Sequence, residues 1–384
     1  MEPAGGRVLP VGFYFYTGGL HMTKEVKLAK KEVEETLTKK SIVKAVTPSK
    51  FYLSTGCTLL NLACTGRPND GFPSGKYTYI VGDTRSGKTF LCMTCLAEAT
   101  IDSDFDDYHL ILDNVEDGCN FDIEGLFNKK LADRLEPPAW DGDKPSYSRT
   151  IQEFYYNMHN LLEKGEPFVY VLDSMDGLTT DESTEHFDDM KDAHEQGKAA
   201  GGSYLTEKAR INSEYLNNVV RKLPETNSIL IIVSQTRANL GMGAKKKRSG
   251  GNALPFYATV EMWSKVKQTL TKTVKKKKRR IGVLSEVTVK KNRINGKTDT
   301  VEVPIYPTHG FDDVGSCVDY LENEKWWSKE KNSLVATEFD KKGTKPAIIK
   351  YIEENNLEPQ LREIVGQCWH EIAEACAIER KSKY

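Results

Sequence analysis

Residues 82–89 read Gly-Asp-Thr-Arg-Ser-Gly-Lys-Thr, which is the G-x-x-x-x-G-K-T spacing of a phosphate-binding loop. Its glycines allow backbone N–H groups to approach a phosphate chain, and the helix that follows adds the positive end of its dipole. In such a loop Lys88 reaches the β- and γ-phosphates and Thr89 holds Mg²⁺. We therefore predict that the chain binds a nucleoside triphosphate with Mg²⁺. The residues predicted to line the nucleotide form one run: Gly82, Asp83, Thr84, Arg85, Ser86, Gly87, Lys88, Thr89 and Phe90.

The segments on either side of this loop have the composition that the motif requires. Residues 77–81 are β-branched and aromatic, as in a buried strand, and residues 90–97 continue as an apolar helix. A strand, a glycine loop and a helix in this order favour a phosphate-binding loop over an ordinary glycine-rich turn.

Two further strands end in carboxylates. Asp173 ends the apolar run 167–173, and a carboxylate at the tip of a strand beside the loop can hold the water shell of Mg²⁺. The strand at 108–112 is followed by several acidic residues. Glu116 is our candidate for the base that polarises an attacking water, with Asp113 and Asp117 as alternatives. The other interpretation of these residues is an acidic loop that caps the next helix.

A glutamine and a basic, glycine-rich segment follow the strand at 228–233. The amide of Gln235 can hydrogen-bond the γ-phosphate or the attacking water, and can report the nucleotide state to the segment at 238–251. That segment suits contact with a phosphate backbone, and Leu240 or Met242 can wedge between bases. A solvated loop is the alternative.

The order of the apolar segments predicts an α/β fold. Continuous apolar strands at 77–81, 108–113, 167–173 and 228–234 alternate with helical segments such as 149–164. This pattern is typical of a mainly parallel sheet that is buried on both faces.

The segments outside this core have a different character. Three shorter β-like runs, interrupted by the basic stretch 275–280, predict antiparallel edge strands at 257–263, 282–290 and 299–305. Residues 328–384 are predicted to form a small helical tail with two helices in 345–380. We assign the core to residues 51–327.

The N-terminal part is predicted to lie outside the core. Residues 1–21 are expected to be a disordered leader, and residues 22–50 an N-terminal arm whose amphipathic helix covers 24–46. This helix is expected to mediate oligomerisation, with packing on its own domain as the alternative.

Composition excludes several classes of protein. The 384 residues carry a net charge of −1, so only local blocks such as 245–248 and 275–280 indicate a polyanion site. No apolar run approaches the ~18 residues of a membrane span. The eight cysteines include Cys92 and Cys95 in C-x-x-C spacing, but no second pair stands at zinc spacing, which favours buried thiols in a reducing cytosol.

Several segments, taken together, resemble the RecA-type recombinases, and most closely the diverged, phage-type members. Residues 250–260 (Gly-Gly-Asn-Ala-Leu-Pro-Phe-Tyr-Ala-Thr-Val) resemble the family signature. The resemblance covers residues 50–325. It also rests on residues 53–61, on Gln235 as the family's nucleotide-sensing glutamine, on 291–293 (Lys-Asn-Arg) and on 309–319.

The resemblance implies a RecA-like ATPase core and several site residues. Lys291 and Arg293 would reach the ATP of an adjacent subunit, and Phe121 would lie near adenine. The first DNA-binding loop would be 181–210, with Leu205 and Arg210. The second would contribute Arg237, Leu240, Met242, Lys245, Lys246, Lys247, Arg248, Gly250, Gly251 and Asn252.

Three departures from the family pattern concern the base and the basic segments. The strand end at Glu116 has one residue more than the family's Asp-x-Glu pattern. The basic stretch 275–280 lacks a clear counterpart, and the block 245–248 is more basic than in the family.

The function implied is a DNA-dependent ATPase that uses ATP and Mg²⁺. It would form helical filaments on single-stranded DNA and exchange strands with homologous duplex DNA, aided by single-strand-binding and loader proteins. No membrane partner is expected, and the location would be the cytoplasm of a bacterium or a phage-infected cell. A ring helicase or DNA motor of the same fold, and an ATP-binding assembly scaffold, are the alternatives.

Overall fold

A computed structural model describes residues 49–119, 121–183, 207–237, 247–248 and 251–380 of this chain. The predicted leader lies outside these residues, as does the predicted arm up to residue 48. The compact unit begins at Ser49.

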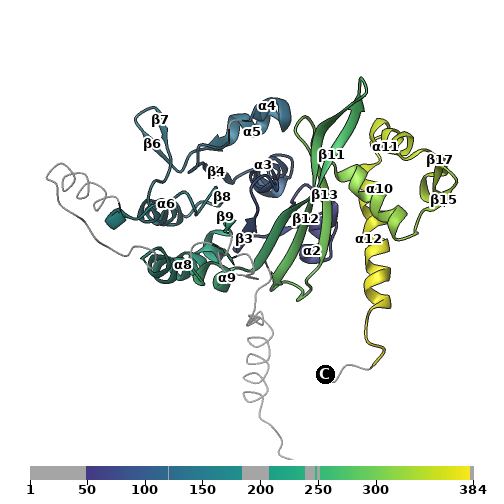
Figure 1. The fold of residues 1–384 in the computed structure, drawn as a ribbon. Helices are drawn as coiled ribbons and strands as arrows, with labels where there is room; N and C mark the ends of the chain where they lie inside the picture. Colours follow the sequence, from purple (N-terminus) through teal and green to yellow (C-terminus); the bar gives the residue numbers. More distant parts are fainter. Residues whose placement is uncertain (1–48, 120, 184–206, 238–246, 249–250, 381–384) are drawn as a thin grey trace, which may run out of the picture. The chain divides into compact units, whose positions relative to one another are not determined.

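A ten-stranded sheet forms the centre of this unit (Figure 1). Five strands run parallel in the order β3–β9–β8–β4–β5, and β11 adds to the other side of β3, also in parallel. Beyond β11, the strands β12, β13 and β14 continue antiparallel, and β10 pairs antiparallel with β9. The bounds are β3 (Tyr77–Gly82), β4 (His109–Asp113), β5 (Leu135–Glu136), β8 (Phe168–Leu172), β9 (Ile229–Arg237), β10 (Lys247–Arg248), β11 (Val260–Val274), β12 (Lys277–Asn292), β13 (Thr300–Tyr306) and β14 (Gly310–Phe311). The predicted parallel sheet with antiparallel edge strands is confirmed.

The sheet is buried on both faces because alternate residues of each parallel strand enter two different cores. Ile80 of β3 packs in one core, whereas its neighbours Tyr79 and Val81 pack in the other. Helices α2 (Thr58–Thr65), α3 (Lys88–Glu98) and α10 (Asp313–Asn323) belong to the first core. Helices α6 (Ile151–Lys164), α8 (Glu207–Thr226) and α9 (Ala253–Tyr257) belong to the second. This double burial explains why the strands read as unbroken apolar runs.

The edge strands differ from the prediction in two respects. The basic stretch 275–280 does not interrupt the sheet, because β11 and β12 pair from Val260↔Asn292 to Val274↔Lys277, with three register shifts along the way. The stretch forms the turn and the first residues of β12. Residues 257–259 were predicted as strand, but Tyr257 ends α9 and β11 begins at Val260. Together β11 and β12 form a long two-stranded ribbon (Figure 1).

The C-terminal part contains the two predicted helices, α11 (Lys345–Glu354) and α12 (Glu358–Ala375). It also contains a three-stranded antiparallel sheet that was not predicted, formed by β15 (Ser328–Glu330), β16 (Ser333–Ala336) and β17 (Lys341–Gly343). These strands have three or four residues, and β15 and β17 are mostly charged, so they lack the longer apolar run that indicates a strand. Ile352 of α11 and Leu361 of α12 join the first core.

The remaining elements are short. They are β1 (Tyr52–Leu53), β2 (Phe72–Pro73), β6 (Ala139–Asp141), β7 (Lys144–Ser146), α4 (Ile123–Leu126), α5 (Lys129–Arg134) and the 3₁₀ turns Ser103–Phe105 and Thr337–Phe339. Within the described residues, no helix is both long and apolar enough to span a membrane. Cys92 and Cys95 are buried in the first core, and both thiols are free, as predicted.

Candidate nucleotide-binding site

The phosphate-binding loop lies between β3 and α3, and its two glycines are required by close contacts. A Cβ on Gly82 would lie 2.0 Å from Oγ of Ser264, on the neighbouring strand. Gly87 has φ +89°, and a Cβ there would lie 2.2 Å from Cδ1 of Ile305. The hydroxyls of Ser86 and Ser264 are hydrogen-bonded at 2.7 Å, which fixes the loop to β11. The backbone therefore takes the conformation that a phosphate cradle needs.

Lys88 is held at this loop by its own backbone. Its ammonium donates hydrogen bonds to the carbonyl oxygens of Gly82 (3.0 Å) and Asp83 (2.8 Å). Burial lowers the pKa of Lys88, while nearby carboxylates, Asp173 first among them, oppose that change. The charge is thus partly desolvated and close to where a phosphate chain would lie.

Thr89 and Asp173 offer two oxygen ligands side by side. The Thr89 hydroxyl is close enough to the Asp173 carboxylate to lower its pKa, and Asp173 is only 8% exposed. Burial raises the pKa of Asp173, whereas Thr89 and Lys88 act in the opposite direction. Among the described residues, no cluster of three or more His, Cys, Asp or Glu side chains could hold a metal by itself. This pair fits Mg²⁺, which usually binds one or two protein oxygens and completes its shell with phosphate and water.

Glu116 and Gln235 meet at the ends of two strands, as a hydrolytic site requires. Nε2 of Gln235 lies 3.1 Å from each carboxylate oxygen of Glu116. The hydroxyl of Ser174 donates a second hydrogen bond to Glu116. The Glu116 side chain is nevertheless exposed, so water can reach it.

The two alternative carboxylates do not share this position. Asp113 is fully buried and accepts hydrogen bonds from the Ser148 backbone N–H (2.9 Å) and the Tyr170 hydroxyl (2.7 Å). Burial raises the pKa of Asp113, and these donors oppose that change. Asp117 lies in the following turn with φ +47°. The geometry therefore favours Glu116 over both.

A cavity of about 650 Å³ opens beside the loop. Its apolar wall includes Phe90 and Phe121, whose ring centroids are 5.5 Å apart. Arg85 and Arg280 line the same cavity as Lys88. Its remaining lining residues are Gly87, Thr89, Ile281, Gly282, Val283, Ile305 and Pro307. The space suits a planar base with an attached anionic chain. The position of Arg280 could not be predicted, because no local pattern links residue 280 to a loop almost 200 positions earlier.

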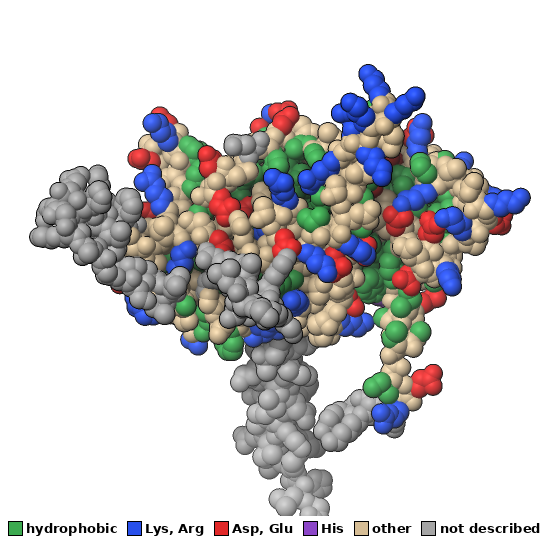
Figure 2. Space-filling view, viewed as in Figure 1, with side chains coloured by type: hydrophobic (Ala, Val, Ile, Leu, Met, Phe, Trp, Pro, Cys, Tyr) green, Lys and Arg blue, Asp and Glu red, His purple; other side chains and the backbone are tan. Residues whose placement is uncertain are grey.

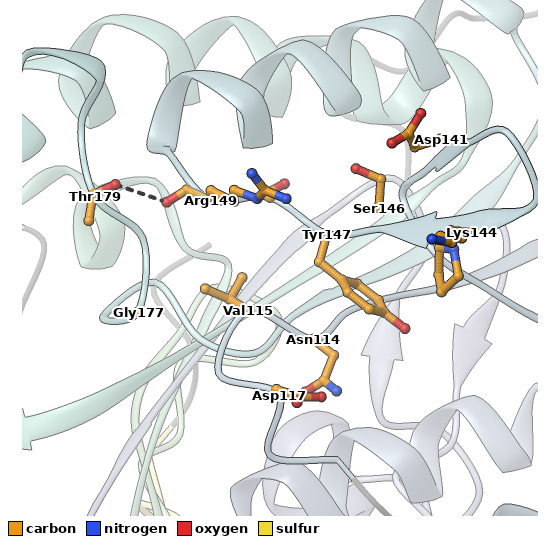
Figure 3. Close-up of a pocket in the computed structure, with 12 residues that line it drawn as sticks. Asn114, Val115, Asp117, Asp141, Lys144, Ser146, Tyr147, Arg149, Gly177 and Thr179 are labelled. Atoms are coloured by element: carbon orange, nitrogen blue, oxygen red, sulfur yellow. Dashed lines mark hydrogen bonds between the residues drawn. The ribbon is translucent and has the colours of Figure 1, made fainter. Parts of the chain in front are cut away.

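A second cavity, of about 520 Å³, lies beside the segment that follows β4 and the β6–β7 hairpin (Figure 3). Tyr147 and Lys144 border it on the side of the β6–β7 hairpin, and Asn114 and Asp117 border it after β4. The Thr179 hydroxyl donates a hydrogen bond of 3.1 Å to the Arg149 carbonyl at its far wall. The two cavities share no lining residue, so only the first adjoins the phosphate loop.

Lys291 and Arg293 are far from the phosphate loop of their own chain. In the strand register, Lys291 of β12 lies opposite Glu261 of β11. Glu261 lies in turn opposite Tyr79, three residues before the end of β3. Since β12 runs antiparallel to β3, the chain moves away from the loop towards Arg293, by roughly 10–15 Å at 3.3 Å per residue. Both cations contact the carbonyl of Phe256, at 2.8 Å and 2.9 Å.

The residues predicted to contact DNA lie partly outside the described segments, namely Leu205, Leu240, Met242, Lys245, Lys246 and Gly250. The backbone of Arg237, Lys247 and Arg248 forms the β9–β10 pairing. Gly251 has φ +82° and a Cβ there would lie 2.7 Å from Cβ of Ala209 on α8, and Asn252 immediately precedes α9.

The predicted first loop, 181–210, is corrected at its C-terminal end. Residues from Glu207 onward belong to α8. Arg210 is therefore helical, and its exposed side chain lies 3.6 Å from the Glu214 carboxylate, one turn further along.

Known proteins with similar sequences carry the name RecA. The family described as RecA N-terminal domain matches residues 158–312, which include Asp173, Gln235 and the segment 291–293. Protein RecA of Trichodesmium erythraeum is 25% identical over 358 residues, covering 88% of this chain and 87% of that protein. Protein RecA of Prochlorococcus marinus is 25% identical over 369 residues, covering 93% and 87%. Protein RecA of Wolinella succinogenes is 26% identical over 306 residues, 77% of each chain.

Fold, site and sequence similarity agree. The parallel sheet with antiparallel edge strands carries a phosphate loop after β3 and a carboxylate after β8. Gln235 lies near the end of β9, at the same edge of the sheet. The similarity extends over most of the chain at about one identical residue in four. The chain is therefore similar to the RecA proteins over most of its length, which supports a diverged RecA-type recombinase.

Proposed function

We propose that this protein is a DNA-dependent ATPase that assembles into helical filaments on single-stranded DNA and exchanges strands with a homologous duplex. Its family supports a role in DNA recombination or repair. The observation that carries the finer proposal is the separation of Lys291 and Arg293 from the phosphate loop of their own chain. Cations at that end of the sheet are too far away to reach the loop of their own chain, so we infer that they act on the loop of another copy.

Assembly follows from this arrangement. A copy that offers its loop at one end of the sheet and its cations at the other makes a head-to-tail contact, and such contacts generate a filament when they do not close. Lys291 and Arg293 would neutralise charge on the transferred phosphoryl group of the neighbour's nucleotide. ATP would therefore hold adjacent copies together, and hydrolysis would loosen them.

The hydrolytic step would use groups from four strand ends. Lys88 would bind the β- and γ-phosphates, and Thr89 with Asp173 would hold Mg²⁺. The ion, when bound, would neutralise charge on the phosphate oxygens. Glu116 would accept the proton of the attacking water, oriented by the Gln235 amide, whose Nε2 lies 3.1 Å from Glu116.

A short path connects the nucleotide to the DNA-binding segment. The Thr236 hydroxyl donates a 2.6 Å hydrogen bond to Asp83 of the phosphate loop. Thr236 and Arg237 pair in turn with Arg248 and Lys247 of β10. A shift of Gln235 towards a γ-phosphate would therefore move the basic segment 238–251, which we propose contacts the DNA strand together with the first loop.

Electron microscopy with and without ATP and single-stranded DNA tests the assembly. We expect helical filaments that require both ligands. Closed rings would support a DNA motor of the same fold, and an ATP-dependent assembly that ignores DNA would support a scaffold. Either result would contradict the recombinase proposal.

Replacing Arg293 by alanine should lower DNA-stimulated ATP hydrolysis by about 10–10²-fold. The loss should be smaller than for an isolated arginine finger, because Lys291 remains as a second cation. The sharper measurement mixes this variant with Lys88→Ala. If Arg293 acts on the neighbouring copy, an interface is active when one copy supplies Lys88 and its neighbour supplies Arg293. Random assembly of the two variants gives this combination at about one interface in four, so part of the activity returns. An inactive mixture of two folded variants would show that both groups serve the same chain.

Replacing Arg280 by glutamine should raise the KM for ATP by about fivefold, since an exposed charge contributes about 1 kcal/mol at most. Arg280 lines the cavity beside Lys88, whereas the adjacent Arg279 does not. Arg279→Gln is therefore the matched control, because successive strand residues point to opposite faces. Equal KM values for the two variants would remove Arg280 from the nucleotide site.

A further inference from the structure

The end of the β11–β12 ribbon concentrates positive charge. Six cations lie there, which we call the ribbon tip: Lys272, Lys275, Lys276, Lys277, Lys278 and Arg279. All six are exposed, and Figure 2 shows them as a group of Lys and Arg side chains at the end of the ribbon. None of them forms an ion pair with another residue in the described part of the chain. The ion pairs of the ribbon itself, such as Lys265–Glu286, lie nearer its base.

The cations occupy positions that favour other residues. Lys275 and Lys276 form the two-residue turn, with φ +50° and +62°. A turn with two positive φ values favours Asn-Gly, since other side chains are strained there. Lys272 also lies directly opposite Arg279, and like charges across a strand pair destabilise a sheet. The charged residues of the ribbon tip therefore lower the local stability of the ribbon, and such a loss of stability is typical of functional sites.

The ribbon carries these cations well beyond the body of the sheet. Ser264 of β11 pairs with Gly82, at the start of the phosphate loop, and β11 continues to Val274. The end of β11 is therefore roughly 30 Å beyond Gly82 along the strand, although Arg280, next to the ribbon tip, still lines the nucleotide cavity. In the sheet, β3 lies between β11 and β9. The basic segment 238–251 follows β9. The ribbon tip and that segment thus start from different sides of the nucleotide site.

We propose that the ribbon tip is a binding surface for the phosphate backbone of duplex DNA. This surface would act in addition to the DNA-binding loops. The proposal rests on the proposed recombinase function, because strand exchange is what brings duplex DNA to the protein. A two-stranded β-ribbon fits the major groove of B-DNA, where phosphates flank it on both sides. Duplex DNA also presents one charge per about 1.7 Å, twice the density of a single strand, to a rigid array of cations. Bound phosphates would offset the repulsion between Lys272 and Arg279.

The test removes charge while improving the turn. The variant Lys275→Asn, Lys276→Gly, Lys277→Thr, Lys278→Thr introduces residues that favour this turn and these strand positions, so it should fold at least as well. The control removes the same charge from the C-terminal sheet, at Lys329, Lys331, Lys341 and Lys342, each replaced by glutamine. Duplex and single-stranded DNA binding are measured for both proteins over a salt series, together with ATP hydrolysis in the absence of DNA.

We expect the ribbon variant to bind duplex DNA at least about tenfold more weakly than the control. Its salt slope should be flatter by about 0.9 for each phosphate that the variant no longer neutralises. Its single-strand binding and its basal hydrolysis should match the control. Duplex affinity and slope equal to those of the control would overturn the proposal. The proposal would also be overturned if the ribbon variant lost affinity only for single-stranded DNA. The same holds if it lost self-assembly while its duplex binding stayed normal.

Failure of the ribbon proposal and failure of the proposed function give different results. If the wild-type protein forms ATP-dependent filaments on single strands but the ribbon variant binds duplex normally, only the ribbon proposal fails. If single-strand binding and assembly are indifferent to ATP, the recombinase function fails, while the duplex measurement still decides the ribbon tip.

Discussion

Lys88→Ala should reduce ATP hydrolysis by about 10³-fold or more and abolish strand exchange. One preorganised donor to a developing charge is worth about 10²–10³-fold, and Lys88 is also expected to bind the nucleotide before the reaction. Its ammonium lies within 3.0 Å of two loop carbonyls in a partly desolvated position, so no neighbouring cation can replace it without moving. Steady-state hydrolysis with single-stranded DNA measures the effect, and fluorescent-nucleotide binding separates affinity from turnover.

The matched control is Lys76→Ala, at the opposite end of the same strand. Lys76 precedes β3, whereas Lys88 follows the loop after β3. We expect near wild-type hydrolysis from Lys76→Ala and unchanged thermal unfolding for both variants. Normal strand exchange by a folded Lys88→Ala protein in the presence of ATP would refute the proposed mechanism.

Glu116→Gln should lower hydrolysis by about 10²–10⁴-fold, the usual contribution of a general base, while ATP binding and filament formation persist. The glutamine keeps one carbonyl oxygen for the Ser174 hydroxyl and the Gln235 amide, so the local structure should survive. A filament that binds single-stranded DNA but no longer turns over ATP is the expected phenotype. The measurement is the lifetime of the filaments after ATP is removed. Filaments of the variant should dissociate far more slowly than those of the wild-type protein.

The two neighbouring carboxylates provide the comparison. Asp113→Asn should destabilise the fold by about 1–3 kcal/mol, because the amide N–H₂ would replace one of the two buried oxygens that accept from the Ser148 N–H and the Tyr170 hydroxyl. Thermal or urea unfolding measures that loss. Asp117→Asn should change neither stability nor turnover greatly, because asparagine also tolerates its positive φ. A loss of turnover in a stable Asp117→Asn protein, with normal turnover in Glu116→Gln, would transfer the role of base to Asp117.

The sequence by itself determined the architecture of the core and the phosphate loop, because both depend on local patterns. Unbroken apolar runs indicated strands buried on two faces, and the structure shows alternate residues such as Ile80 and Val81 in different cores. The loop at 82–89 combines spacing, glycines and flanking elements within some twenty residues. Asp173 and Gln235 could be predicted in the same way, since each follows an apolar strand.

The tertiary structure alone decided which side chains meet. Asp113, Glu116 and Asp117 are equivalent in sequence, and only the approach of β9 to β4 across β8 brings Gln235 to Glu116. Arg280 lines the nucleotide cavity because β12 pairs with β11 from Lys277 to Asn292 and so begins before the basic stretch ends. The small C-terminal sheet escaped prediction because its strands are too short and too polar for a periodic signal. Local propensity records what each segment prefers, whereas a site depends on distances between segments, and those are set by the packing of the whole chain.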